Sequence, residues 1–131
     1  YLRYFVDKLG LRKDVILTGG VSESELAAYY QAADLFMCMS EHEGFCVPLI
    51  EAIHAGVPVM AFDSTAVPET LGDTGVLIKE KRFPEIAELA RYVIENTDLR
   101  NKIVEEQKTR LQVYSREAVL QQWQQAIGNF Y

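Results

Sequence analysis

The stretch Ser40-Glu41-His42-Glu43-Gly44-Phe45-Cys46-Val47-Pro48-Leu49-Ile50-Glu51-Ala52 decides which fold this chain is expected to adopt. It follows an apolar run at residues 35–39, turns near a glycine and continues as a mostly apolar helical pattern. A strand, a turn and a helix in this order are typical of a parallel α/β sheet, whose ligands bind at the carboxyl ends of the strands. The stretch predicts an α/β fold with a site at this turn. Its two carboxylates and the helix start between them favour a hydroxyl-rich, phosphate-bearing ligand.

Strand and helix patterns alternate on both sides of this stretch. Short apolar runs indicate further buried strands at residues 15–17, 57–62 and 76–78. Helices are indicated at residues 2–9, at 22–33 with a Ser22/Glu25 capping box, at 47–55, from Pro68 onward, and in three stretches after Pro84, the last with Phe130 on its apolar side. The alternation predicts a Rossmann-like parallel sheet of about four strands with flanking helices, in a single domain of residues 1–131.

Composition excludes several classes of protein. The chain has 131 residues, enough for one domain, with 49% apolar and 24% charged residues. A net charge of −6 argues against nucleic acid and against an anionic membrane surface. No apolar run is long enough to span a membrane, no signal peptide is visible, and two cysteines do not make a disulfide framework. We expect a cytoplasmic protein in a reducing setting.

Lysine and arginine are distributed unevenly. All 13 lie at or before Lys13 or at or after Lys79, whereas ten aspartates and glutamates lie between Asp14 and Ile78. A helix start offers only about half a positive charge to a phosphate. This segment is therefore expected to need cations from elsewhere to hold a diphosphate.

The two carboxylates of the opening stretch are the main candidates for site residues. The helix at residues 47–55 looks apolar around its circumference, so we expect Glu51 to be buried and to need donors such as two ribose hydroxyls. A structural partner for Glu51 is the alternative. Glu43, in the turn, could face a sugar hydroxyl or a developing positive charge, or be a solvated turn residue. Gly44 lets the backbone approach a phosphate, although such junctions also occur as plain connections.

Other polar groups carry less weight. His42 and His54 are twelve residues apart and no further Cys or His completes a ligand set, so no metal site is expected. Tyr29 and Tyr30 are expected to pack in the core. The Gly19-Gly20-Val21 turn is glycine-rich and follows the strand expected at residues 15–17, on the side where ligands bind.

Taken in order, these segments resemble the C-terminal domain of the retaining glycosyltransferases of family 4, which have the GT-B fold. The resemblance covers nearly the whole chain, and the Glu43-x7-Glu51 element with an internal Gly44-Phe45 is its most specific part. The matching segments are Val15-Ile16-Leu17-Thr18-Gly19, Ala32-Ala33-Asp34-Leu35-Phe36, Ser40 with Glu43-Gly44-Phe45, Pro48-Leu49 with Glu51-Ala52, Ala55-Gly56-Val57-Pro58-Val59, Pro68-Glu69 and Gly75-Val76-Leu77-Ile78.

The resemblance implies the transfer of a sugar from a nucleotide-diphospho sugar to an acceptor, with retention at the anomeric carbon and with no metal or other cofactor. Glu43 would be catalytic, contacting the donor sugar and stabilising an oxocarbenium-like transition state, and Glu51 would bind the ribose hydroxyls. The backbone at the helix start would contact the sugar and diphosphate, and the glycine turn would line the base pocket. The implied donor-binding residues are Gly19, Gly20, Val21, Gly44, Phe45, Cys46, Val47 and Glu51.

Two positions depart from the family pattern. Cys46 stands where a second glycine is common, so the backbone there must either avoid a positive φ or be strained. Thr65-Ala66-Val67 stands where the family often has two glycines, which leaves that loop without an expected donor contact.

The resemblance further implies an N-terminally truncated, partial domain. A family domain begins with two strands and with the Arg and Lys that neutralise the diphosphate, and these strands would lie between residues 15–17 and 35–39 in the order 3-2-1-4-5-6. The gap would be closed by sheet rearrangement, by strand exchange in a homo-oligomer, or by segments outside this sequence. The acceptor domain would also lie outside it, so we expect the isolated chain to be inactive.

Two other function classes stay open. Another GT-B enzyme, such as a nucleotide-sugar epimerase, shares the same overall pattern. A non-enzymatic flavodoxin-like or receiver-like binding module shares the α/β alternation. A receiver should show clustered acids at strand ends and a lysine at a late strand; Lys79 follows the late strand at residues 76–78, but Ala61-Phe62-Asp63 supplies no lysine. The segment from Glu43 to Glu51 favours the transferase.

Overall fold

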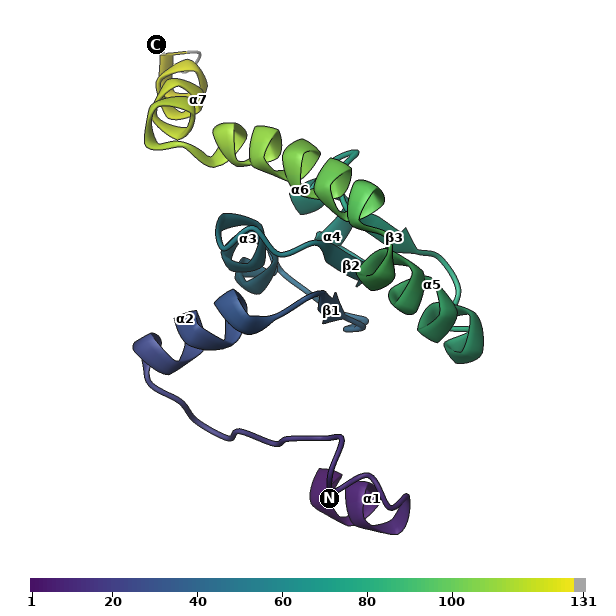
Figure 1. Cartoon of the computed structure of the whole chain (residues 1–131). Coiled ribbons are helices and arrows are strands. Elements are labelled where there is room, and N and C mark those ends of the chain that lie inside the picture. Colours follow the sequence, from purple (N-terminus) through teal and green to yellow (C-terminus); the bar gives the residue numbers. More distant parts are fainter. Residues whose placement is uncertain (129–131) are drawn as a thin grey trace.

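Three of the four predicted strands form in the computed structural model, which describes residues 1–128. β1 (Phe36–Cys38), β2 (Val59–Phe62) and β3 (Val76–Ile78) pair in parallel in the order β1-β2-β3 (Figure 1). Phe36 lies opposite Val59, and Met60 lies opposite Val76. The helices are α1 (Leu2–Lys8), α2 (Glu23–Ala32), α3 (Val47–His54), α4 (Val67–Leu71), α5 (Phe83–Glu95), α6 (Thr97–Leu111) and α7 (Arg116–Gly128), with a short 3-10 turn η1 (Gln112–Tyr114) before α7.

The central strand β2 separates two apolar cores. Successive side chains of a strand point to opposite faces, and Val59 and Ala61 pack in one core while Met60 packs in the other. The first core is completed from α3 and α4, chiefly by Leu49, Ala52, Ile53, Val67 and Leu71. The second is completed from β3, α5 and α6 by Ile78, Ile86, Val93 and Ile103. Helices therefore cover both faces of the sheet, as the sequence predicts.

Gln107 of α6 ties the start of β2 to the helical layer. Its side chain is only 1% exposed. The side-chain oxygen accepts a hydrogen bond from the Val59 N–H (2.9 Å), and the side-chain amide donates to the Val57 carbonyl (3.0 Å). Pro58 lies between these residues and has no N–H of its own. The buried glutamine thus satisfies the backbone groups on both sides of the proline.

Local sequence signals at helix ends are confirmed. The Ser22 and Glu25 side chains each accept from the other residue's backbone N–H at the start of α2. Gly56, directly after the end of α3, has a φ of 77°. The Ser115 hydroxyl accepts from the Ala118 N–H at the start of α7 (3.2 Å). Phe130, predicted on the apolar side of this helix, lies outside the described residues.

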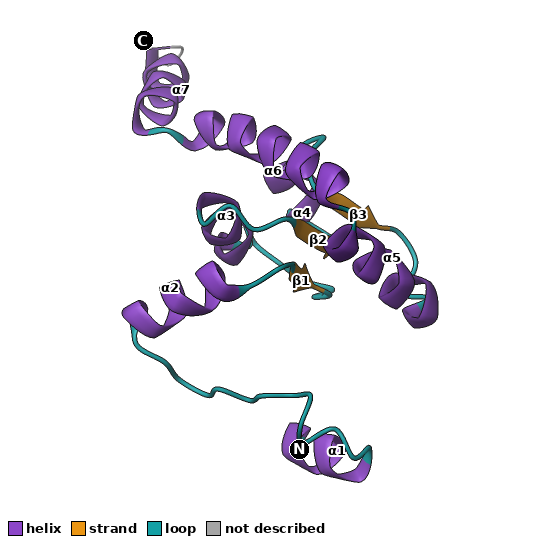
Figure 2. Cartoon of the chain, in the orientation of Figure 1, coloured by secondary structure: helices purple, strands orange, loops and turns teal. Residues whose placement is uncertain are grey.

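The predicted strand at residues 15–17 is wrong. This segment is part of an extended connection between α1 and α2 that runs apart from the sheet (Figure 2), and Ile16 is 79% exposed. A strand forms only where another strand pairs with it. No segment among residues 1–128 pairs with it. The gap predicted beside β1 is therefore not closed by rearrangement within the described part of the chain.

β1 lies at the edge of the sheet, and one of its faces is partly exposed. Its only pairing in residues 1–128 is with β2. Met37 at its centre is 42% exposed, which corrects the prediction of full burial for residues 35–39. Such an open edge presents unpaired backbone groups to a partner. None of the described helices is long and apolar enough to cross a membrane.

Candidate functional site

The turn between β1 and α3 brings Glu43 to the carboxyl end of the sheet. α3 starts directly after it, with Pro48 in the first turn and no side chain capping its first N–H groups. Pro48 has no N–H and the Leu49 N–H donates to the Cys46 carbonyl (3.0 Å), so this helix start offers an anion chiefly the Val47 N–H. A side chain added at Gly44 would meet no atom within 4 Å, so the backbone here borders open space. The geometry leaves room for a ligand against the turn.

Three hydroxyl side chains after β2 hold the backbone of this turn. The Thr65 hydroxyl accepts from the Glu43 N–H (2.9 Å) and donates to the Glu43 carbonyl (2.8 Å). The Ser64 hydroxyl donates to the Ser40 carbonyl (2.8 Å), and the Thr70 hydroxyl donates to the Phe45 carbonyl (2.6 Å). The sequence analysis does not predict this supporting role for Ser64, Thr65 and Thr70. Their position after β2 is a signal for it, because neighbouring parallel strands end at the same edge of a sheet and their following loops lie close together.

Cys46, the residue before α3, adopts the left-handed conformation with φ 63° and ψ 62°. Of the two outcomes expected for a residue in this glycine position, strain is the one that occurs. The left-handed region costs a non-glycine residue about 1–2 kcal/mol. The side chain is 6% exposed and packs in the first core, which offsets part of that cost.

Glu51 is exposed, so the prediction that it is buried is wrong. Leu49, Ala52 and Ile53 form the buried face of α3, and the helical repeat of 3.6 residues turns Glu51 away from that face. The Tyr30 hydroxyl of α2 donates to its Oε2 atom (3.0 Å). Burial and then the hydrogen bond to Glu51 raise the pKa of Tyr30 to about 12. A structural partner for Glu51, the alternative considered above, is thus present.

Glu51 and Tyr30 line a cavity of about 620 Å³ between α2 and α3. Leu26 and Ala27 supply apolar wall from α2, and His54 lies on the α3 side. The cavity therefore combines apolar surface with one carboxylate, which suits a flat or ring-shaped ligand that carries hydroxyl groups.

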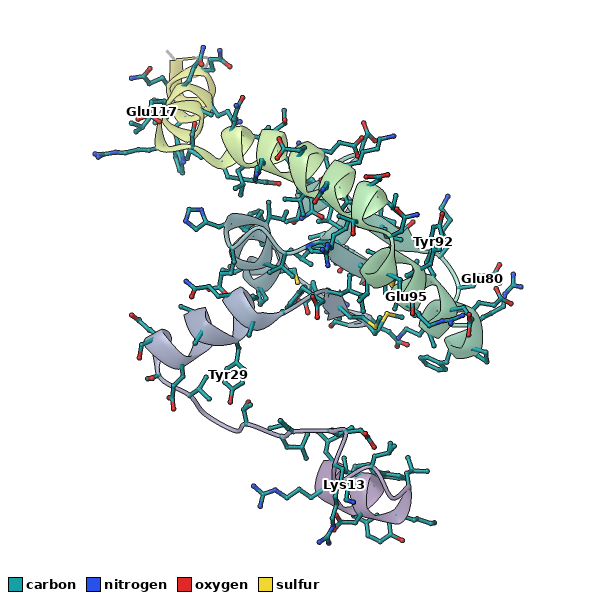
Figure 3. All side chains as sticks on the ribbon, viewed as in Figure 1. Lys13, Tyr29, Glu80, Tyr92, Glu95 and Glu117 are labelled. Atoms are coloured by element: carbon teal, nitrogen blue, oxygen red, sulfur yellow. The ribbon has the colours of Figure 1, made fainter. Side chains whose placement is uncertain are left out.

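The neighbouring tyrosines differ. Tyr30 is half-buried and its ring lies 5.9 Å from the Phe36 ring, as expected for core packing. Tyr29 is 49% exposed and extends from α2 toward the connection with α1 (Figure 3), which corrects the prediction that it packs in the core.

The glycine turn at Gly19, Gly20 and Val21 lies in the connection between α1 and α2. Because the strand at residues 15–17 is not formed, the turn does not sit at a strand end. Among residues 1–128, no hydrogen bond joins it to Glu43 or Glu51. Its place in a base pocket stays a prediction.

Lys81 reaches the turn from later in the sequence, and Arg110 lies against α4; both cations are engaged. Lys81 Nζ lies 2.6 Å from the Glu41 carboxylate and 4.6 Å from the centre of the Phe62 ring. The hydrogen bond and the charge of Lys81 hold the pKa of Glu41 below its usual range. Arg110 donates to the Glu69 and Thr70 carbonyls at the end of α4.

Cys38, Glu43 and Cys46 form a cluster at this turn. Each offers one ligand atom, and the three atoms lie within 4.8 Å of one another. The two histidines weighed as metal ligands in the sequence are both exposed. The cysteines were passed over because their separation in sequence does not reveal that the turn brings them together.

The chain matches the family described as "Glycosyl transferases group 1" over residues 1–110. It is 41% identical over 59 residues to the O-antigen chain mannosyltransferase B of Escherichia coli, covering 45% of this chain and 16% of that protein. It is 31% identical over 106 residues to the GDP-mannose-dependent alpha-(1-6)-phosphatidylinositol monomannoside mannosyltransferase of Mycobacterium tuberculosis, covering 74% and 28%. The chain thus spans less than a third of the length of either relative.

Solved structures give the same fold. The C-terminal domain of the glycosyl transferase group 1 family protein LpcC from Francisella tularensis aligns with a TM-score of 0.71 at 30% identity, covering 86% of this chain and 59% of that one. HepE from Anabaena, in complex with UDP and glucose, aligns with a TM-score of 0.83 at 23% identity, covering 98% and 35%. At 23% identity, the likeness to HepE concerns the fold alone.

Proposed function

Because this chain belongs to the glycosyl transferases group 1 family, we propose that residues 1–131 form the donor-binding part of a retaining family 4 glycosyltransferase of the GT-B type. The reaction is transfer of a sugar from a nucleotide-diphospho sugar to an acceptor, in the cytoplasm, with no metal or other resident cofactor required. Relatives named as mannosyltransferases, one of them GDP-mannose-dependent, make GDP-mannose the first donor to test.

One observation carries the proposal: Glu43 lies in the turn before the uncapped start of α3, and Glu51 lies on α3 itself, so the two carboxylates flank the helix start along the chain. The Val47 N–H at that start receives the phosphate nearest the sugar. Glu43, on a turn fixed by Thr65, faces the sugar, where a carboxylate favours positive charge developing at the anomeric carbon. Glu51, oriented by Tyr30 in the cavity beside α2, receives the ribose hydroxyls, and its exposure makes it accessible to them.

Charge explains why the whole protein is needed for activity. A diphosphate needs more positive charge than one helix start provides. In the described part of the chain, Lys81 is paired with Glu41 and Arg110 is bound to carbonyls of α4. We therefore propose that cations from other parts of the enzyme complete the donor site, together with the acceptor domain, and that the isolated chain is inactive.

The test uses the whole protein with GDP-mannose. Titration calorimetry measures donor affinity, and NMR of the product measures the anomeric configuration. Glu51→Ala should weaken nucleotide binding at least about tenfold, the effect expected from losing two charge-assisted hydrogen bonds. Glu117→Ala, an exposed carboxylate of α7 that does not line this cavity, is the matched control and should leave affinity unchanged.

Unchanged affinity in Glu51→Ala would refute the ribose assignment. A product with inverted configuration would refute the retaining mechanism. Release of an epimerised donor without transfer to any acceptor would point instead to a nucleotide-sugar epimerase.

A further inference from the structure

The cluster of Cys38, Glu43 and Cys46 is built from one strand, one turn and one helix start. Cys38 is the last residue of β1, and Cys46 directly precedes α3. Their sulfur atoms lie 3.9 Å apart, and the Glu43 carboxylate lies within 4.8 Å of both. Three potential ligands of the kinds that bind transition metals thus come together from a stretch of nine residues, 38–46.

The surrounding structure holds these three residues in place. β1 is paired with β2, and Cys46 is buried against the first core. Thr65 fixes the Glu43 backbone through two hydrogen bonds. The cluster therefore sits on supported elements, and Cys38 and Glu43 are half-buried, which leaves solvent access from the turn.

We propose that Cys38, Glu43 and Cys46 bind a thiophilic divalent cation of the zinc class, a metal that the transfer reaction itself does not require. Two thiolates on tetrahedral zinc, with Zn–S bonds of about 2.3 Å, lie about 3.8 Å apart. The observed 3.9 Å between the sulfurs matches this separation. Three protein ligands leave the fourth position to water, and sulfur ligands select against magnesium and calcium.

A divalent cation would bind the two cysteines as thiolates and release their protons, and its charge would offset the repulsion among two thiolates and a carboxylate. The sulfur separation is also nearly twice a disulfide bond of about 2.05 Å, so the two cysteines are not bonded to each other.

Metal binding has a consequence that rests on the proposed function. A cation held by Glu43 occupies the carboxylate assigned to the donor sugar. Zinc and the donor should therefore exclude each other, so that zinc acts as an inhibitor of sugar transfer.

The test titrates the reduced chain with Cd²⁺ and Zn²⁺ in a thiol-free buffer. Cd²⁺ binding is followed by the thiolate-to-metal charge-transfer absorbance, which reports sulfur ligation directly. We expect one ion per chain, loss of the band in Cys38→Ser and in Cys46→Ser, and weakening by at least about tenfold in Glu43→Gln. Glu41→Gln is the matched control for a nearby carboxylate and should bind as the unmodified chain does.

Several results would overturn the site. These are a charge-transfer band that survives Cys38→Ser, Mg²⁺ competing equally with Zn²⁺, or a Cys38–Cys46 disulfide in freshly purified chain. Because Cys46 lies in the core, circular dichroism checks each variant, and Cys38→Ser at the half-buried position decides the outcome if Cys46→Ser unfolds. Metal binding without an effect on donor binding would contradict the proposed role of Glu43 while leaving the metal site standing.

Discussion

The hydroxyl of Thr65 both accepts from the Glu43 N–H and donates to the Glu43 carbonyl, so one side chain after β2 fixes the backbone of the turn after β1. Thr65 itself has a φ of 43°, an unusual value for a β-branched residue. The sequence comparison left this loop without a role in donor contact. The structure gives it a supporting role through Glu43.

Thr65→Val keeps the shape of the side chain and removes both hydrogen bonds. If Glu43 acts on the donor sugar, loosening its backbone should lower kcat/KM for sugar transfer by about 10–100-fold. Thr74→Val is the control, since it removes a comparable bond to the Leu71 carbonyl away from the turn. Equal rates for the two variants would contradict the role of Thr65.

Tyr30→Phe removes only the hydroxyl that donates to Glu51. The free carboxylate should then be less well oriented, and nucleotide affinity should fall by about fivefold, equivalent to about 1 kcal/mol. Tyr29→Phe, one residue earlier and exposed, is the matched control. Calorimetry with the nucleoside diphosphate measures both, and a loss in the Tyr29 variant alone would reverse the assignment.

Gln107→Leu should destabilise the domain by about 1–3 kcal/mol, because the Val59 N–H and the Val57 carbonyl lose their buried partner. Chemical denaturation measures the free energy of unfolding. Glu106→Ala changes the neighbouring, exposed position of α6 and should alter stability far less. Equal effects would mean that the glutamine bridge contributes nothing.

Cys46→Gly and Cys46→Ala separate the strain at this residue from the loss of its sulfur. Both variants lose the thiol, but only alanine keeps a Cβ in the left-handed conformation. The glycine variant should therefore be roughly 1 kcal/mol more stable than the alanine variant. The comparison is made by denaturation in the presence of a chelator. A more stable alanine variant would show that the turn relaxes.

Acid should weaken the start of α2 through Glu25. The Ser22 hydroxyl and then the Ser22 N–H lower the pKa of Glu25 from its usual 4.5. A lowered folded-state pKa adds stability above the unfolded pKa, and this stability is lost as pH falls through the folded value.

The stability difference between the unmodified chain and Glu25→Ala should accordingly be largest near neutral pH and shrink below pH 4.5. Glu23→Ala, in the same helical turn but without these bonds, controls for general helix electrostatics. A difference that stays constant between pH 7 and pH 3 would exclude the proposed titration.

Local signals in the sequence predict most of this fold. The capping box at Ser22, the glycine after α3 and the apolar runs at β2 and β3 each specify a structure through nearby residues. The run at residues 15–17 has an equally good strand pattern but no partner, and strand pairing is a property of distant segments that local patterns do not contain.

The site was less predictable for a related reason. Glu51 was expected to be buried because residues 47–55 are mostly apolar, yet an apolar helix against one face of a sheet still exposes its far side. Tertiary structure brings Thr65 to the turn and places the sulfur atoms of Cys38 and Cys46 next to each other. Their roles follow from which strand ends are neighbours.

The bridge from Gln107 to β2 also affects when this domain can be completed during synthesis. Chains emerge from the ribosome N-terminus first, and all three strands precede Gln107 in the sequence. A nascent chain that ends before α6 has exposed every strand but still lacks the group that satisfies the backbone around Pro58. The sheet should therefore reach its final packing only after α6 has been translated.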